Sequence, residues 1–235
     1  MIKQAIVLAG GFGTRLQTVV QDVPKPMALI NDRPFLDYQL NYLKSFGIEH
    51  IIFSVGYKHE HILNYFGDSF NGMRIDYAVE ESPLGTGGGI LNAFQFVKSG
   101  AALVVNGDTM FEVDLQDFSQ KHNSKNAQIS LALREIDDVS RYGVVETDAN
   151  HRIIGFAEKG ERKGQGKING GIYIIEKHFF ETNRFEQKFS MEKDAFERLY
   201  KEQAFYGFPY KSYFLDIGIP EDYKKAQNEF KKLGY

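Results

Sequence analysis

Residues 8–27 read L-A-G-G-F-G-T-R-L-Q-T-V-V-Q-D-V-P-K-P-M, and this stretch decides how the rest of the chain is interpreted. Three glycines follow its apolar start: Gly10, Gly11 and Gly13. Because glycine has no β-carbon, backbone amides in such a loop can close on a ligand, and polyphosphates are commonly held in this way. Arg15 follows the last glycine by two residues, and Lys25 lies between two prolines that restrict the backbone. The stretch fits a phosphate-binding loop flanked by two cations, or else a tight turn between a strand and a helix with two solvated basic residues.

The composition excludes several kinds of protein. The 235 residues contain no cysteine, which rules out disulfides, thiolate chemistry and zinc sites built from cysteine. A formal net charge of −3 lacks the excess of positive charge that is typical of nucleic-acid-binding proteins. No apolar run approaches the about 18 residues of a membrane span. We therefore expect a cytoplasmic protein that binds neither nucleic acid nor a membrane.

The spacing of the apolar residues predicts an α/β fold. In the first half, strands are expected at residues 5–8, 50–55, 74–79 and 101–105, and helices at residues 34–46, 58–66 and 90–97. Such alternation is the βαβ pattern of a mainly parallel sheet. The second half is richer in strands, which are expected at residues 128–133, 143–147, 153–157, 167–175 and 211–215, with helices at 190–199 and 220–233.

The predicted architecture is a Rossmann-like three-layer fold with a mixed, mainly parallel sheet. No low-complexity linker interrupts residues 1–235, so we count one domain. Within it, a nucleotide-binding half extends to about residue 110, and a β-rich half over residues 111–235 closes over it. The glycine loop leaves the carboxyl end of the first strand, where open α/β sheets bind their ligands.

Two aspartates follow apolar runs that are expected to be strands. Asp108 ends A-L-V-V-N-G-D and Asp216 ends S-Y-F-L-D. An aspartate at such a point commonly begins a turn, but it can also hold a hard cation such as Mg²⁺ beside phosphate oxygens. Together with the glycine loop and its two cations, the pair favours a polyphosphate site that contains Mg²⁺.

Two better-known phosphate motifs do not match the glycine stretch. A Walker A loop needs G-x-x-x-x-G-K-[ST], and residues 10–16 have neither the spacing nor the Lys-Ser/Thr pair. A dinucleotide fingerprint needs G-x-G-x-x-G, and Leu16 stands where the third glycine would allow close helix packing. A phosphate pocket of another kind remains.

Six further motifs follow the glycine stretch along the chain. Together with it they extend over nearly the whole sequence, from Ile6 to Tyr223. They are P-L-G-T-G-G-G, N-G-D, Y-G-V-V, A-E-K, N-G-G-I-Y and D-I-G-I-P-E-D-Y. With L-A-G-G-F-G-T-R-L and P-K-P-M, this series resembles the sugar-1-phosphate nucleotidylyltransferase family. The version G-T-R-L-Q-T-V-V-Q-D-V-P-K-P-M-A is most similar to members that transfer a guanylyl group to a manno-heptose 1-phosphate. One departure is that residues 17–23 do not carry a proline and a threonine in the arrangement that many relatives have soon after the Arg-Leu pair.

The resemblance implies that a phosphate oxygen of a sugar 1-phosphate attacks the α-phosphorus of GTP and expels pyrophosphate. The catalytic residues would be Arg15, Lys25 and Asp108, with Mg²⁺ on Asp108 and Asp216. The attacking oxygen is already ionised at neutral pH, so no general base is needed, and catalysis depends on alignment and charge. The implied nucleotide-binding residues are Leu8, Ala9, Gly10, Gly11, Gly13, Thr14, Arg15, Lys25, Glu80, Pro83, Gly85, Thr86, Asn106, Gly107 and Asp108.

The resemblance also implies where the sugar binds. Lys159 would hold the sugar phosphate and Glu158 the sugar hydroxyls. The implied sugar-phosphate-binding residues are Gly143, Glu158, Lys159, Asn169 and Gly170. The partners are then GTP and a sugar 1-phosphate, and a homodimer is left open.

Glu80 is the residue that bears on the choice of base. It matches a position where thymidylyltransferase relatives read the base edge with an amide. A carboxylate only accepts hydrogen bonds, and guanine offers two adjacent donors, so guanine is favoured. The alternative is a solvated Glu80, with the backbone reading the base. Three other functions stay open: guanylyl transfer to mannose 1-phosphate, uridylyl transfer to an amino sugar phosphate, and a regulatory subunit that only binds a nucleotide sugar.

Overall fold

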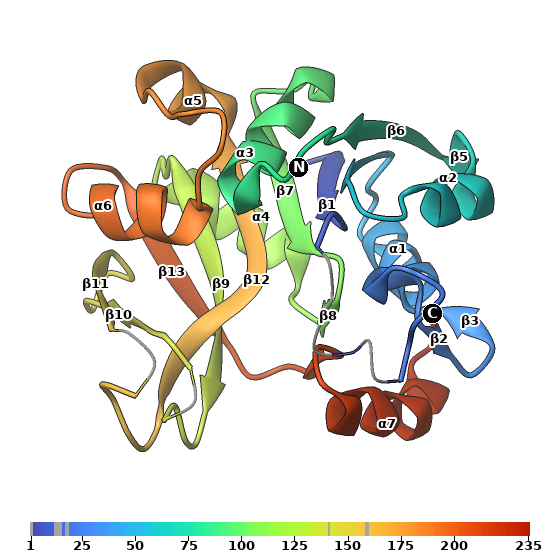
Figure 1. The fold of residues 1–235 in the computed structure, drawn as a ribbon. Coiled ribbons are helices and arrows are strands. Elements are labelled where there is room, and N and C mark those ends of the chain that lie inside the picture. The colour runs from blue at the N-terminus through green and yellow to red at the C-terminus, as the bar shows by residue number, and fades with distance from the viewer. Residues whose placement is uncertain (1, 12–15, 17–18, 141, 158–159) are drawn as a thin grey trace.

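The computed structural model describes residues 2–11, 16, 19–140, 142–157 and 160–235. Over these residues one mixed sheet has the strand order β11-β10-β12-β7-β1-β4-β6-β5, with β9 paired to β12 and β13 paired to β9 (Figure 1). In Figure 1, β1 and β7 run downward, so that their carboxyl ends point toward β8 and α7. The predicted α/β fold with a mixed, mainly parallel sheet is confirmed.

The first half contains the parallel core of the sheet. Its strands are β1 (Gln4–Leu8), β4 (His50–Val55), β6 (Met73–Val79) and β7 (Ala101–Asn106), each within one residue of its predicted bounds. Its helices are α1 (Phe35–Ser45), α2 (Glu60–Phe66) and α3 (Gly85–Ala93), and its short strands are β2 (Leu29–Ile30), β3 (Arg33–Pro34) and β5 (Ser69–Phe70).

The second half extends the same sheet by antiparallel pairing of β12 to β7. Its strands are β9 (Ile129–Ile136), β10 (Val144–Thr147), β11 (Ile153–Ala157), β12 (Gly166–Glu176) and β13 (Phe205–Tyr210). Its helices are α4 (Leu115–Ser124), α5 (Lys177–Thr182), a π-helical turn at Met191–Phe196 that continues into α6 (Glu197–Leu199), and α7 (Pro220–Glu229). A separate small sheet pairs β8 (Thr109–Phe111) with β14 (Phe214–Asp216).

Helices cover both faces of the sheet because neighbouring strand residues point in opposite directions. In β4, Ile51 and Phe53 belong to the apolar core that includes Leu36 of α1. Ile52 belongs to a second core, which includes Ile90 of α3. Two buried cores on opposite sides of one sheet give the three-layer arrangement that the sequence predicted.

Several elements differ from the prediction, among them the following three. The helix expected at residues 90–97 instead spans Gly85–Ala93, so the glycines of the motif P-L-G-T-G-G-G, the second glycine stretch of the chain, lie within it. Helix α4 was not expected; Asp114 caps it by accepting hydrogen bonds from the amides of Gln116 and Asp117. Instead of a strand at 211–215, the chain forms β13 at Phe205–Tyr210 and the short β14, because β13 finds its partner in β9, far away in the sequence.

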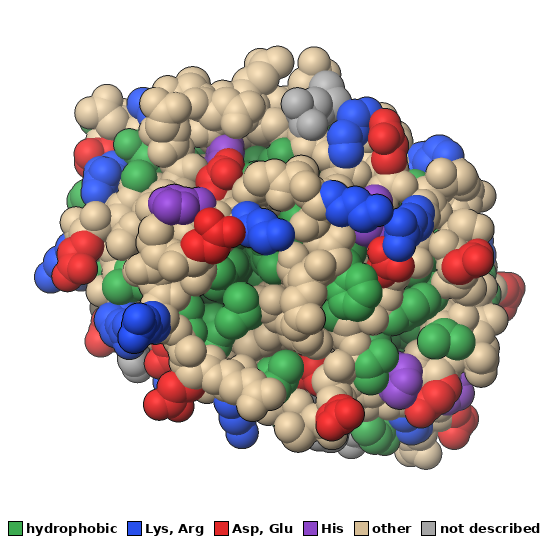
Figure 2. Space-filling model, turned by 90° about the horizontal axis from the view of Figure 1, so that it is seen from above, with side chains coloured by type: hydrophobic (Ala, Val, Ile, Leu, Met, Phe, Trp, Pro, Cys, Tyr) green, Lys and Arg blue, Asp and Glu red, His purple; other side chains and the backbone are tan. Residues whose placement is uncertain are grey.

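Figure 2 shows the face above the amino ends of the parallel strands. Lysine and arginine side chains alternate there with aspartate and glutamate, and apolar side chains lie between them. This face therefore carries no concentration of one charge. In the part of the chain that the structure describes, no helix has the length and apolar character needed to cross a lipid bilayer.

Candidate functional site

Lys25 is the centre of a charged cluster beyond the carboxyl ends of the strands. It begins the 3₁₀ helix Lys25–Met27, and its side chain is only 9% exposed. Its Nζ donates hydrogen bonds to Oδ2 of Asp108 at 2.5 Å and to Oδ1 of Asp216 at 3.4 Å. The structure thus brings together three of the predicted site residues, although Asp108 and Asp216 lie 83 and 191 residues after Lys25 in the chain.

The turn after β7 positions Asp108. The amide of Gly107 donates to the carbonyl of Leu8 at 2.9 Å, and a β-carbon at Gly107 would lie 2.7 Å from that oxygen. Only glycine allows so close an approach of the two backbones. The carbonyl of Asp108 itself accepts from the amide of Ile217 at 3.0 Å. This contact joins the turn to the segment that follows Asp216.

Asp216 reaches the site by a different route from the one predicted. It ends β14, which pairs with β8 in the small antiparallel sheet and not with the main parallel sheet. Its Oδ1 accepts from the amide of Gly218 at 2.6 Å. Burial and the charge of Asp108 raise the pKa of the Asp216 carboxyl, and Lys25 opposes this shift. Because the two carboxylates repel each other, a cation bound between them would stabilise their ionised forms.

The donor set suits Mg²⁺. No group of three or more His, Cys, Asp or Glu side chains that could hold a metal occurs among the described residues. Mg²⁺ does not require such a cage, because it commonly binds one or two carboxylates and completes its shell with water and substrate phosphates. Asp108 and Asp216, with side chains 31% and 45% exposed, offer two carboxylates that a phosphate ligand can reach.

The first glycine loop follows Leu8, whose carbonyl contacts the turn that carries Asp108. Ala9 donates from its amide to the carbonyl of Ser54 at 2.8 Å, which fixes the start of the loop against β4. A β-carbon at Gly10 would lie 3.4 Å from Glu80 Oε1, whereas one at Gly11 would meet none of the described residues within 4 Å. Gly13, Thr14 and Arg15 lie outside the described residues.

Glu80 is half-buried between the glycine loop and α3. Its Oε1 accepts from the hydroxyl of Ser54 at 3.2 Å, and its Oε2 accepts from the amide of Leu84 at 3.0 Å. Protein donors thus hold the carboxylate in place, in contrast to a side chain free in solvent. Each carboxylate oxygen still has a lone pair for a base edge.

Close packing against Phe189 explains why glycine occurs at two positions of the second glycine stretch. Gly85 has a positive φ of 75°, and a β-carbon there would lie 2.6 Å from the carbonyl oxygen of Phe189. Gly87 packs against the ring of the same phenylalanine. Thr86 next to them donates to Oε2 of Glu192 at 2.7 Å and accepts from the amide of Met191 at 2.9 Å. Gly85 and Thr86 therefore connect α3 to the turn at 189–192, while Pro83, Gly85 and Thr86 remain exposed.

Two cavities share Asn169 in their lining, and the first of them also reaches Asp216 of the charged cluster. The first, of about 350 Å³, is lined among others by Asn106, Asn169, Gly170, Asp216, Asp222 and Lys225. The second, of about 240 Å³, is lined among others by Gly143, Ala157, Asn169, Glu192 and Lys193. Glu158 and Lys159 lie outside the described residues and follow Ala157 directly in the chain.

The sequence interpretation missed several residues that line these cavities. Asp222 and Lys225 come from α7, and Glu192 and Lys193 come from the π-helical turn. The motif D-I-G-I-P-E-D-Y contains Asp222 and signals α7, but nothing near Glu192 in the sequence indicates its contact with Thr86, 106 residues away.

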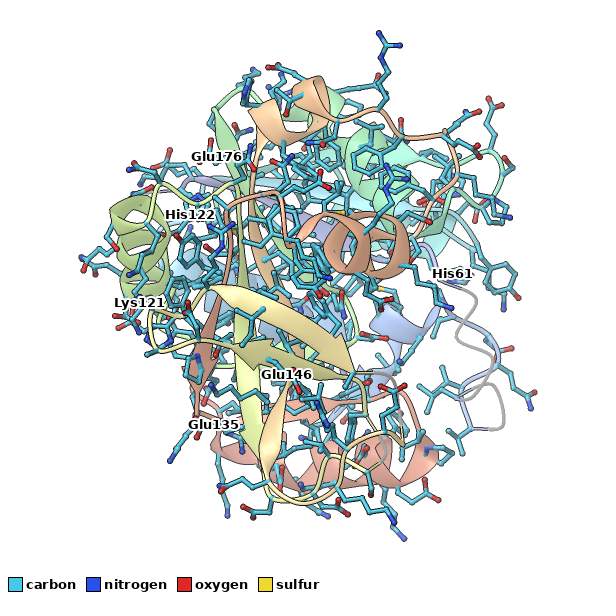
Figure 3. All side chains as sticks on the ribbon, turned by 90° about the vertical axis from the view of Figure 1, so that its left-hand side faces the viewer. His61, Lys121, His122, Glu135, Glu146 and Glu176 are labelled. Atoms are coloured by element: carbon cyan, nitrogen blue, oxygen red, sulfur yellow. The ribbon has the colours of Figure 1, made fainter. Side chains whose placement is uncertain are left out.

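A titratable pair that includes a buried histidine lies away from this site. His122 of α4 and Glu176 of β12 are labelled in Figure 3, and His122 Nε2 lies 3.1 Å from Glu176 Oε1. Glu176 is paired with Ala101 at the amino end of β7, whereas Asp108 follows the carboxyl end. Burial lowers the pKa of His122, and Glu176 opposes the shift. The pair is a satisfied structural contact at the other end of the sheet.

Comparison with known proteins gives one consistent result. The family model described as "Nucleotidyl transferase" matches residues 4–232. The D-glycero-alpha-D-manno-heptose 1-phosphate guanylyltransferase of Aneurinibacillus thermoaerophilus is 47% identical over 226 residues, which cover 96% of this chain and 97% of that protein. The protein of the same name from Campylobacter jejuni is 46% identical, over 94% of this chain and 96% of its own. The crystal structure of HddC from Yersinia pseudotuberculosis complexed with GMP-PN superimposes with a TM-score of 0.86 at 39% identity, over 97% of this chain and 100% of that one.

Proposed function

This chain belongs to the nucleotidyl transferase family, and we propose that it joins GTP to a sugar 1-phosphate and releases pyrophosphate. We propose D-glycero-α-D-manno-heptose 1-phosphate as the sugar substrate, since relatives 46–47% identical over nearly their whole length are named for it. The product would be a GDP-heptose for bacterial surface polysaccharide, made in the cytoplasm. The observation that carries the proposal is Lys25 held between Asp108 and Asp216, where the turn that carries Asp108 contacts Leu8 at the start of the glycine loop.

In the proposed mechanism this chain supplies charged groups and backbone amides at fixed positions, and it supplies no general base. Backbone amides at Gly10 and Gly11 and the side chain of Arg15 would bind the triphosphate. Lys25 would offset the negative charge that develops between the two phosphates during transfer. Mg²⁺, which we propose is held by Asp108 and Asp216, would neutralise charge on the triphosphate. Because the attacking phosphate oxygen is already ionised, the remaining work of the protein is alignment.

The sugar phosphate would occupy the two cavities that share Asn169. Gly143, Asn169 and Gly170 line them, and Glu158 and Lys159 follow Ala157 in the chain. We propose that Lys159 binds the sugar phosphate and Glu158 the hydroxyls. The nucleotide would then lie on residues 1–110 and the sugar on residues 111–235.

Glu80→Gln is expected to lower the preference for GTP over UTP by about tenfold, because an amide donor then faces the donors of guanine. The measurement is kcat/KM for both triphosphates with one sugar 1-phosphate. Glu81→Gln, at the exposed neighbouring carboxylate, is the control and should leave the ratio unchanged. An unchanged GTP/UTP ratio in Glu80→Gln would mean that other groups read the base.

The proposed function is tested by pyrophosphate release from four triphosphates, each combined with several sugar 1-phosphates. The expected result is the highest kcat/KM for GTP with the manno-heptose 1-phosphate. A higher value with mannose 1-phosphate, or with UTP and an amino sugar phosphate, would identify one of the two alternative transferases. Binding of a nucleotide sugar without pyrophosphate release from any combination would identify a regulatory subunit.

A further inference from the structure

Gln39 is a polar residue on the buried side of α1. It is 3% exposed, and its neighbours Leu36, Leu40 and Leu43 belong to the apolar core. Its Nε2 donates two hydrogen bonds of 2.8 Å, one to the carbonyl of Asn106 and one to the carbonyl of Thr109. The amide group thus contacts the backbone on both sides of Gly107 and Asp108.

The orientation of this amide is determined by its partners. Two carbonyl oxygens face it, so the NH₂ group must point toward them and Oε1 must point away. Oε1 is buried and has no hydrogen-bond partner among the described residues. A buried acceptor without a partner lowers stability, and such a group in a folded protein calls for an explanation. The two donated bonds provide that explanation.

The two carbonyls belong to strands of two different sheets. Asn106 ends β7, and Thr109 begins β8, where it pairs with Asp216 of β14. Gln39 therefore ties the end of the main sheet to the small sheet that carries Asp216. One turn earlier in α1, the amide of Phe35 donates to the carbonyl of Ala28 at 3.0 Å, which attaches the segment of Lys25 to the same helix.

We propose that Gln39 is a positioning residue, which holds the turn at residues 106–109 so that the carboxylate of Asp108 is presented to the metal–nucleotide complex. This inference rests on the proposed metal-binding role of Asp108. Glutamine suits the position because one planar amide supplies two diverging donors without charge. Methionine has a similar length and no donor, and asparagine has both donors but is one methylene shorter.

The test measures binding of Mn²⁺ in the presence of GTP, by electron paramagnetic resonance of free Mn²⁺, together with the melting temperature. Gln39→Met should weaken Mn²⁺ binding about 10- to 100-fold, the usual effect of removing a group that orients a metal ligand. The kcat should fall as well, with KM for the sugar 1-phosphate unchanged. Should Gln39→Met not fold, Gln39→Asn is measured instead, and its shorter reach should weaken Mn²⁺ binding in the same direction.

Gln4→Met is the matched control, since Gln4 is also a buried glutamine, 6% exposed. Its Oε1 accepts from the amides of Lys98 and Ser99 at the amino ends of the strands. This variant should lower the melting temperature and leave Mn²⁺ affinity within about twofold of the wild type, because its contacts do not reach Asp108.

The possible results distinguish the positioning role of Gln39 from the metal-binding role of Asp108 on which it rests. Weaker Mn²⁺ binding in the Gln39 variants but not in Gln4→Met supports the positioning role. Wild-type Mn²⁺ affinity in a Gln39 variant overturns it, and so does an equal loss in Gln4→Met. If the wild-type protein with GTP binds no Mn²⁺, the proposed metal site fails and the inference fails with it.

Discussion

Lys25→Met is expected to lower kcat by about a hundredfold to a thousandfold, the range found when one preorganised charge-stabilising group is removed from an active site. The Lys25 ammonium is almost fully buried and contacts both Asp108 and Asp216, so no solvated lysine can replace it. Methionine keeps most of the length and the apolar stem. The loss therefore reports on the charge rather than on packing.

Lys3→Met is the control for Lys25→Met. Lys3 is exposed and pairs with Glu49 near the amino ends of the strands, so its removal should leave kcat unchanged. Lys25→Met should also melt at a lower temperature, since two carboxylates then face each other without a counter-charge, and saturating Mg²⁺ should recover part of this loss. A kcat within about threefold of the wild type would contradict the central role of Lys25 in catalysis.

Asp216→Asn is expected to lower kcat about a hundredfold and to raise the Mg²⁺ concentration for half-maximal rate at least tenfold, because one of two proposed carboxylate ligands is lost. The fold should not suffer. Burial and Asp108 raise the pKa of Asp216, which means that its negative charge is disfavoured in the folded protein, and the neutral amide removes that repulsion. An unchanged or higher melting temperature with a large loss of activity is the expected combination.

Asp148→Asn serves as the control for Asp216→Asn. Asp148 lies in the hairpin between β10 and β11, where its Oδ1 accepts from the amides of Asn150 and Arg152. Its replacement should cost stability and leave the Mg²⁺ dependence unchanged. Pyrophosphate release by Asp216→Asn at the wild-type rate and the wild-type Mg²⁺ requirement would refute the metal assignment.

The parallel core and the charged cluster are the parts that the sequence predicted well. The apolar runs of β1, β4 and β7 are buried on both faces, so they stand out in the sequence. Asp108 was correctly placed after β7. Asp216 was expected at the edge of the same sheet, but it arrives through β14, whose pairing with β8 joins residues about 105 apart and leaves no local pattern.

Elements that depend on distant partners could not be predicted. The stretch F-Y-G-F-P-Y contains a glycine and a proline, and it forms β13 only because β9 lies beside it. Gly85 and Gly87 of α3 would favour a loop, but Phe189, about 100 residues later, occupies the space that side chains at these two positions would need. Nothing in the local sequence distinguishes Gln39 from other residues of its helix, because its two carbonyl partners lie 67 and 70 residues away.

The fate of labelled phosphate tests nucleotidyl transfer most directly. The wild-type protein is incubated with Mg²⁺, a manno-heptose 1-phosphate and GTP labelled at either the α- or the γ-phosphorus, and the products are separated. The expected result is that the α label appears in a GDP-sugar and the γ label in pyrophosphate, with neither reaction in Lys25→Met above about one hundredth of the wild-type rate. The γ label in inorganic phosphate or in a sugar bisphosphate, or no transfer of the α label to the sugar, would contradict guanylyl transfer at this site.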